Sequence, residues 1–505
     1  MPVNDHPEKM RTTEKKYDVT VAGSGLGGLL CGYILAKEGM RVCILEKSHH
    51  AGGCLQTFQR KGMVFDTGVH YFGGMDPGQT LYRYWDYFGL TRSVKMERMN
   101  PDGFDIIGIN GKDYPMAMGF DHFADQLAPF FPSEKENIKK YVRALQEVSS
   151  AFALYNLEIP KDLKEENYRH QGAYEFFSSL TGMKTLTSVL AGNSLLYSGN
   201  RNNTPLHIPA LINHSFISSA WRTIGGSAQI ADRLIEEIVA MGGELHLNEE
   251  VTEIGRKETI FKVLTKTGKC FVSKKFISGM HPSKTLQIMD PTTFRRSYYI
   301  RIKNLKNTIS SFGVYLVLKE GSFPYLDHNY YYHKTEDVWN DGKNQGWPSS
   351  YMLHTPAPAS KDGFARNAIL IAAMPFEKVR KWENTVLGDR GDDYLEFKDH
   401  CASELLELAA QQFPGLRQSV EYMEVSTPLT WRDYTGTPDG SMYGIEHDFQ
   451  DPLVTTLLPA TKVPGFYFTG QNINLHGVLG VTIGAVLTCA EIVGMEYLLN
   501  KVRNA

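Results

Sequence analysis

The sequence predicts an α/β protein with two parts: a parallel-sheet domain assembled from separated segments, and an α+β domain formed by the insertions between them. Three observations support this prediction. An apolar, strand-like run at residues 17–22 leads through clustered glycines into a helix-like run, which is how a βαβ unit begins. Further strand and helix patterns of this kind occur near residues 225 and 465. With 505 residues, the chain is also too long for one compact core.

The overall composition excludes several classes of protein. A formal net charge of -3 gives no long-range attraction for nucleic acid, so we expect no nucleic-acid partner. The six cysteines are scattered and form no CxxC pair, so we predict neither a disulfide framework nor a metal site, and a reducing, cytoplasmic location. Residues 1–16 are polar and charged, lack the apolar core of a secretory signal, and are predicted to be a disordered tail.

Residues 17–39 carry the most informative motif. The strand YDVTVA ends at GSGLGG, where Gly23, Gly25 and Gly28 match G-x-G-x-x-G, and a helix pattern follows. These glycines permit a tight turn, the approach of a pyrophosphate, and close helix–strand packing, while the helix N-terminus supplies N–H donors. A second strand, RVCILEK, ends with Glu46, which is placed to accept hydrogen bonds from a ribose. The motif predicts a Rossmann-type dinucleotide site, to which we also assign Ser24, Gly27 and Lys47.

The segment after Glu46 distinguishes FAD from NAD as the dinucleotide. Residues 51–74, AGGCLQTFQRKGMVFDTGVHYFGG, form a glycine-rich stretch where a nicotinamide dehydrogenase would normally continue with a helix. This stretch resembles the segment that large FAD oxidoreductases lay along the ribityl chain and the pyrophosphate. We therefore predict FAD as the cofactor, contacted by Gly53 and Cys54, with NAD(P)H as a candidate electron donor.

Two later segments resemble the remaining parts of the same domain. Residues 225–255 read as a helix ended by Gly242 and Gly243, a short strand, and a second strand carrying Val251. Residues 464–493 read as a strand, a loop and a helix whose N-terminus would point at the flavin. The predicted domains are the disordered tail (1–16), an FAD-binding domain (17–75, 220–285 and 460–505) and a substrate domain with a helical insertion (76–219 and 286–459).

Together these motifs resemble the phytoene desaturase, carotenoid isomerase and retinol saturase family of FAD-dependent oxidoreductases. The resemblance covers nearly the whole chain and is closest to the retinol saturase and carotenoid isomerase branch, through FDTGVHYFGG (65–74), NYYYH (329–333), STPLTWRDYTGTPDGSMYG (426–444) and GFYFTGQNINLHGVLG (465–480). It implies a glutathione-reductase-like FAD-binding domain and a discontinuous α+β substrate domain. It also implies a long apolar polyene or isoprenoid substrate, in which a C=C bond is saturated, desaturated or isomerised.

The resemblance also implies further flavin contacts. Val251 would offer its backbone to the adenine, and the C-terminal contacts would be Gly470, Gln471, Gly477, Val478 and Leu479. Two positions depart from patterns common in the family. Gln471 replaces an aspartate, as in the retinol saturase branch, and Cys54 stands where an arginine is common. Gln471 can still hydrogen-bond to the ribityl chain, but it carries no charge.

Three residues are candidates for the chemistry: His70, Tyr71 and His476. A neutral His70 imidazole could hold a substrate or transfer a proton, although such a histidine more often bonds to the backbone. Tyr71 is as consistent with packing as with proton donation, and His476 lies where it could tune the flavin.

The aromatic residues of the insertions divide into two groups. Tyr330, Tyr331 and Tyr332 are expected to serve a strand, although alternate members could line an apolar tunnel. Trp431, Tyr434 and Tyr443 flank a Gly/Pro-rich loop and are predicted to contact the substrate.

Contact with a membrane is expected to be peripheral. Residues 477–499, GVLGVTIGAVLTCAEIVGMEYLL, are about long enough to span a bilayer, but Glu491 and several glycines favour a buried helix. An apolar substrate nevertheless partitions into lipid, so the protein is expected to touch the membrane surface without inserting.

Two other functions remain open. A flavin amine oxidase shares the same domain plan and would need aromatic residues around its amine. A non-enzymatic protein that binds FAD or a carotenoid would also carry these motifs. The sequence fixes neither the exact substrate, the direction of the reaction, nor the oligomeric state.

Overall fold

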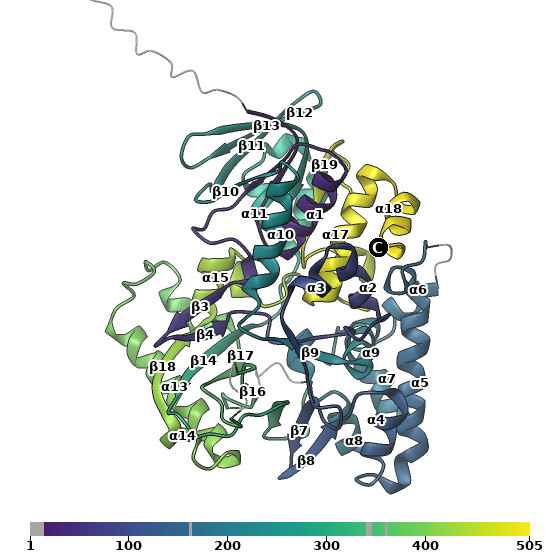
Figure 1. Cartoon of the computed structure of the whole chain (residues 1–505), viewed down its shortest axis with the longest axis vertical. Helices are drawn as coiled ribbons and strands as arrows, with labels where there is room; N and C mark the ends of the chain where they lie inside the picture. The colour runs from purple at the N-terminus through teal and green to yellow at the C-terminus, as the bar shows by residue number, and fades with distance from the viewer. Residues whose placement is uncertain (1–14, 161–163, 340–345, 359–361) are drawn as a thin grey trace, which may run out of the picture.

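The computed structural model describes residues 15–160, 164–339, 346–358 and 362–505. It confirms the predicted α/β fold, which is organised around two seven-stranded sheets. In Figure 1 the first sheet lies at the top of the molecule, the second lies below it, and helices from residues 120–218 form the right flank.

The first sheet unites segments that are far apart in the sequence. Its strand order is β10-β2-β1-β13-β12-β11, with β19 paired to β13. The strand bounds are β1 Lys15–Ala22, β2 Val42–Leu45, β10 Glu244–His246, β11 Val251–Lys257, β12 Ile260–Thr265, β13 Cys270–Ser278 and β19 Phe466–Phe468. β1 runs parallel to β2 and β13, and β13 runs parallel to β19. All four residues of β2 are buried, as is typical of a parallel strand covered on both faces.

Helices from both ends and from the middle of the chain pack together beside this sheet (Figure 1). They are α1 Leu26–Lys37, α10 Ala228–Ala240, α17 Gly477–Val493 and α18 Met495–Arg503. The buried helix expected within 477–499 is present as α17, but Gly494 adopts a φ of +96° and ends it, so residues 495–499 belong to α18. Among the described residues, no helix combines the length and the apolar character needed to cross a membrane.

The second sheet separates two apolar clusters. Its order is β18-β14-β17-β16-β15-β7-β8; β15 and β7 are parallel, and the other neighbours are antiparallel. The bounds are β7 Asp105–Ile109, β8 Lys112–Met116, β14 Ser310–Leu318, β15 Asn329–His333, β16 Ser350–His354, β17 Asn367–Met374 and β18 Val420–Ser426. Because side chains alternate along a strand, Tyr330 packs in one cluster and Tyr331 in the other.

The remaining elements cover these sheets. Two small sheets consist of β3 Thr57–Arg60 with β4 Met63–Asp66, and of β5 Phe72–Gly73, β9 Ala220–Thr223 and β6 Met96–Arg98. The helices of the first insertion are α2 Thr80–Tyr87, α3 Leu90–Ser93, α4 Phe120–Leu127, α5 Lys135–Ala151, α6 Lys164–Arg169, α7 Ala173–Leu180, α8 Lys184–Leu190 and α9 His207–Ser218. The later ones are α11 Pro282–Gln287, α12 Arg296–Asn304, α13 Asp392–Gln412, α14 Leu416–Ser419, α15 Pro428–Thr435 and α16 Pro452–Thr455.

Two adjacent glycines in α1 allow its close packing. A Cβ atom on Gly27 would lie 2.8 Å from both the N and the Cα atoms of Gly470, which follows β19. A Cβ atom on Gly28 would overlap the carbonyl oxygen of Gly23 in the turn after β1. Hydrogen at these positions therefore allows the N-terminal turn, α1 and the C-terminal segment to meet.

We predict that Gly28→Ala destabilises the FAD-free protein by about 1–3 kcal/mol, because the new methyl group would press on a backbone carbonyl that has little freedom to move. Urea unfolding of wild type and variant measures the difference. Gly182→Ala is the matched control, since a Cβ atom there meets no atom within 4 Å. Equal stability of the two variants would show that the Gly28 contact relaxes without cost.

Candidate functional site

The turn between β1 and α1 presents an open helix N-terminus. No side chain of the described residues caps α1, and the N–H of Leu29 donates to the Gly25 carbonyl at the start of the helix. A Cβ atom added to Gly25 would meet nothing within 4 Å. The turn therefore offers unpaired first-turn N–H donors, a positive helix end and space for a ligand, which suits the negative pyrophosphate of FAD.

Glu46 lies beside this turn, where the sequence predicts a ribose contact. Its Oε2 atom accepts hydrogen bonds from the backbone N–H and the hydroxyl of Ser24, at 2.9 and 2.6 Å. Its Oε1 atom accepts one from the N–H of Ser48, at 2.9 Å. The carboxylate thus fixes the turn, and Oε1 retains a lone pair that a ribose hydroxyl can use.

The C-terminal motif completes the same site. Gly470 packs against Gly27, and α17 begins at the exposed Gly477, with no side-chain cap from the described residues. Val478 is buried in its first turn, while Gln471 and Leu479 are half-buried. The loop that leads into α17 is therefore held against the start of α1, and the α17 N-terminus can stabilise negative charge on a ligand.

Other predicted cofactor contacts surround the turn. Gly53 approaches it closely: a Cβ atom on Gly53 would lie 3.0 Å from the Cα atom of Gly25. Lys47 donates a 3.0 Å hydrogen bond from Nζ to the carbonyl of Asp433, which links the turn to α15. Burial raises the pKa of Cys54 to about 11, so its thiol is neutral. Val251 is half-buried at the start of β11 and pairs with Thr265.

Of the three candidate catalytic residues, Tyr71 and His476 are buried and His70 is half-buried, and their partners differ. His70 Nδ1 has no hydrogen-bond partner among the described residues, and burial lowers the pKa of this histidine to about 4. His476 donates from Nε2 to the Leu196 carbonyl at 3.1 Å, and burial lowers its pKa to about 4. Both imidazoles are therefore neutral at pH 7. The backbone bond expected as the alternative for His70 is absent at its Nδ1 atom within the described residues, whereas His476 forms one.

Tyr71 belongs to a buried polar chain that sequence reasoning missed. Its hydroxyl lies 2.9 Å from Asp105 Oδ2 and 2.7 Å from the hydroxyl of Tyr331. Asp105 Oδ1 accepts a 2.9 Å bond from Asn329 Nδ2, and Asn329 Oδ1 lies 2.8 Å from His354 Nδ1. A polar Asp105 at the start of an apolar strand was the one available signal, but its partners lie in segments distant in sequence.

The aromatic residues predicted to contact the substrate are distributed unequally. Tyr443 stacks on His476, with ring centroids 4.3 Å apart. The Trp431 ring and Cys54 both lie beside Gly68. A Cβ atom on Gly68 would be 3.3 Å from the Trp431 ring and 3.0 Å from the Cβ atom of Cys54. Tyr434 is 55% exposed, so its side chain stands apart from this buried group.

Tyr331 connects the polar chain to the C-terminal motif. Burial raises its pKa well above the ordinary value, and the negative Asp105 and the nearby Tyr443 phenol add to this effect. Because Tyr443 also stacks on His476 before α17, residues from the N-terminus, the middle and the C-terminus share one buried neighbourhood.

Known proteins resemble this chain throughout its length. Residues 26–493 match the family described as flavin containing amine oxidoreductase. All-trans-retinol 13,14-reductase of Homo sapiens is 27% identical over 97% of this chain and 87% of that protein. Prolycopene isomerase 1, chloroplastic, of an Oncidium hybrid cultivar is 24% identical, over 96% and 85% respectively. Cyclohexylamine Oxidase from Brevibacterium oxydans IH-35A shares the fold, with a TM-score of 0.62, 15% identity and coverage of 97% and 99%.

These similarities confirm the resemblance to the retinol saturase and carotenoid isomerase branch, and they confirm FAD as the cofactor. The open space at Gly25 and the two uncapped helix N-termini fit such a group. The chain is an FAD-dependent oxidoreductase and belongs to the flavin containing amine oxidoreductase family.

Proposed function

We propose that the protein reduces or isomerises a C=C bond in an apolar polyene or isoprenoid. The observation that carries this proposal is the similarity, over nearly the whole chain, to proteins named as a retinol reductase and a prolycopene isomerase. Both names denote chemistry at the double bonds of conjugated polyenes. NAD(P)H remains the candidate reductant.

The buried neighbourhood around Tyr71 suits such a substrate. FAD, when bound, would exchange a hydride with a carbon of the substrate. The protein would orient that carbon, exclude water and hold the proton that a second carbon needs. The neutral His70 and His476 imidazoles place no charge against an apolar chain, and the Tyr71 hydroxyl offers a proton.

We also infer the roles of the cofactor residues. The pyrophosphate would lie at Ser24, Gly25 and the α1 N-terminus, with the ribose at Glu46. The flavin ring would lie toward Gly470, Gln471 and the α17 N-terminus. The contact between Gly27 and Gly470 supports this arrangement, because it holds the start of α1 against the loop that leads into α17.

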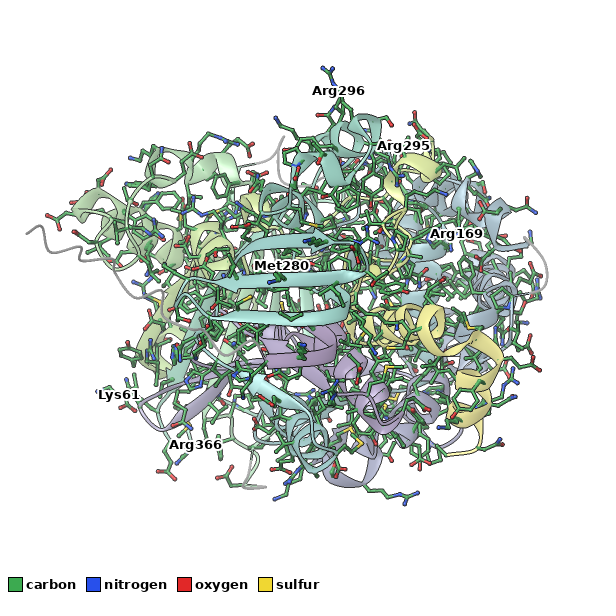
Figure 2. All side chains as sticks on the ribbon, turned by 90° about the horizontal axis from the view of Figure 1, so that it is seen from above. Lys61, Arg169, Met280, Arg295, Arg296 and Arg366 are labelled. Atoms are coloured by element: carbon green, nitrogen blue, oxygen red, sulfur yellow. The ribbon has the colours of Figure 1, made fainter. Side chains whose placement is uncertain are left out.

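An exposed apolar patch offers a place for membrane contact. Leu453 in α16 is 76% exposed, and Leu458, just after that helix, is 70% exposed. Arg301 of α12 holds this segment by donating to the Val454 and Thr456 carbonyls, at 2.9 and 2.7 Å. Arg296, at the start of α12, projects outward at the edge of the molecule (Figure 2). We propose that Leu453 and Leu458 enter the lipid surface from which the substrate is drawn.

For the cofactor, we predict that Gly25→Val abolishes FAD binding, because the branched side chain would fill the space reserved for the pyrophosphate. FAD titration by fluorescence measures the affinity. Gly182→Val, in an equally open position, is the control and is expected to bind FAD like wild type. Normal FAD binding by Gly25→Val would show that the pyrophosphate lies elsewhere.

For the substrate, we predict that the anaerobically reduced protein is reoxidised by retinol or a carotenoid. Flavin absorbance is followed after parallel additions of retinol, a carotenoid, a quinone and an aliphatic amine. Product analysis distinguishes reduction from isomerisation. If the oxidised protein is instead bleached by the amine, and the reduced form ignores every polyene and isoprenoid, the enzyme is an amine oxidase.

For the membrane, we predict that the double variant Leu453→Ser/Leu458→Ser binds phosphatidylcholine vesicles at least about tenfold more weakly than wild type. Two exposed leucines would each lose on the order of 1.5–3 kcal/mol of burial in lipid. Neutral vesicles minimise any contribution from Arg295 and Arg296. The control is Val386→Ser/Leu387→Ser, which removes exposed side chains elsewhere. Release of wild type by moderate salt alone would contradict an apolar contact.

A further inference from the structure

The buried chain around Asp105 has the geometry of a proton store. We propose that Asp105 is a positioning residue that returns a proton to Tyr71 after Tyr71 has protonated the substrate carbon. This inference rests on the proposed reduction of a C=C bond. It assigns a role to a carboxylate that is fully buried and lies outside the glycine motifs.

The hydrogen bonds determine where the proton of Asp105 can reside. His354 Nδ1 and Asn329 Oδ1 are 2.8 Å apart, and an amide oxygen only accepts, so Nδ1 carries the hydrogen. The Asn329 amide group then donates to Asp105 Oδ1 at 2.9 Å. A proton on Asp105 must consequently sit on Oδ2, which faces the Tyr71 hydroxyl at 2.9 Å.

The direction of the bonds between hydroxyls depends on that proton. When Asp105 is ionised, Tyr71 donates to Oδ2, and Tyr331 can donate to the Tyr71 oxygen at 2.7 Å. When Asp105 is protonated, Oδ2 donates to Tyr71, which frees the Tyr71 hydrogen for another acceptor. The same three groups can therefore either retain the Tyr71 proton or release it toward a substrate.

The proposed step balances for reduction of a C=C bond. One carbon would receive a hydride from reduced FAD. A reduced nicotinamide would then return the oxidised FAD to its reduced form. The π electrons form a C–H bond at the neighbouring carbon as the Tyr71 O–H bond breaks. The resulting Tyr71 phenolate takes the Oδ2 proton of Asp105, leaving a carboxylate that solvent later protonates. Tyr331 also lines a cavity of about 40 Å³, which is large enough for a water molecule on that route.

The surroundings of Asp105 suit a group that changes protonation near neutral pH. Burial raises its pKa to about 7, while the bonds from Asn329 and Tyr71 and the positive charge of Arg222 oppose this rise. Two further residues are hydrogen-bonded to the partners of Asp105: Tyr331 to Tyr71, and His354 to Asn329. Burial lowers the pKa of His354 well below its ordinary value, as do the nearby Arg222 and His70. His354 therefore stays neutral while Asp105 titrates.

The same strand provides a matched control. Tyr330 is the neighbour of Tyr331 on β15 and points to the opposite face of the sheet. Its hydroxyl donates to Asp113 at 2.6 Å, so it forms the same type of pair. Asp113, however, is exposed to solvent, whereas Asp105 is not. Asp113→Asn and Tyr330→Phe thus remove an equivalent bond without touching the proposed proton store.

The kinetic test follows flavin reoxidation by retinol in the prereduced holoprotein between pH 5 and 9. The wild-type rate should fall as pH rises through about 7, because the protonated Asp105 is depleted. Asp105→Asn should slow the reaction by about tenfold or more and remove this pH dependence. Both control variants should keep the wild-type rate and profile.

A second variant covers the case in which Asp105→Asn does not fold. Asn329→Ala removes a hydrogen bond that lowers the pKa of Asp105, so the fall in rate should move to higher pH. A purely structural role for Asn329 would leave the midpoint unchanged. An unchanged profile in Asp105→Asn or Asn329→Ala overturns the inference.

An infrared measurement tests the store without turnover. The carbonyl band of a protonated carboxyl group should disappear from the oxidised wild-type holoprotein as pH rises through about 7. The component that titrates near pH 7 should be absent in Asp105→Asn and present in Asp113→Asn, while the buried Asp66, whose pKa burial raises to about 6, accounts for any component lost at lower pH. If this carboxyl band is present but the protein reacts with no polyene, the proposed function is refuted and the proton store is not. Normal polyene reduction without the band would refute the proton store alone.

Discussion

The approach of Gly27 to Gly470 is the contact on which the rest of the site depends. Any side chain at Gly27 would press on the backbone after β19, since its Cβ atom would lie 2.8 Å from two backbone atoms of Gly470. This contact holds the start of α1 beside the loop that leads into α17. Two helix N-termini from opposite ends of the chain can then contribute to one cofactor site, where each supplies a partial positive charge.

Local signals were sufficient to predict much of the fold. The turn, the strand that precedes Glu46 and the helix ended by Gly242 are each defined by residues close together in sequence, and the structure contains all of them. The strands at Ser310–Leu318 and Asn367–Met374 were predictable for the same reason. The break at Gly494 was missed, because an apolar run gives little warning when one glycine takes a positive φ.

The candidate site was less predictable, because its contacts cross large distances in sequence. Asp105 meets Asn329 through the parallel pairing of β7 with β15, and no local pattern indicates which strands will be neighbours. Glu46 illustrates a different limit: its position was predictable, but its three bonds to Ser24 and Ser48 depend on the exact path of the turn. Tyr330 and Tyr331 show that adjacent identical residues can have very different partners: Tyr330 bonds to the exposed Asp113 carboxylate, whereas Tyr331 bonds to the buried Tyr71 hydroxyl.

The pairing of β13 has a consequence for how the enzyme is made. Its first half pairs with β12, which directly precedes it, whereas its second half pairs with β19, nearly 200 residues later. During synthesis, that second half has no β19 partner until residues 466–468 have left the ribosome. The cofactor site is therefore assembled only after both insertions have been made, and a chain that stops before β19 lacks one of its two helix ends.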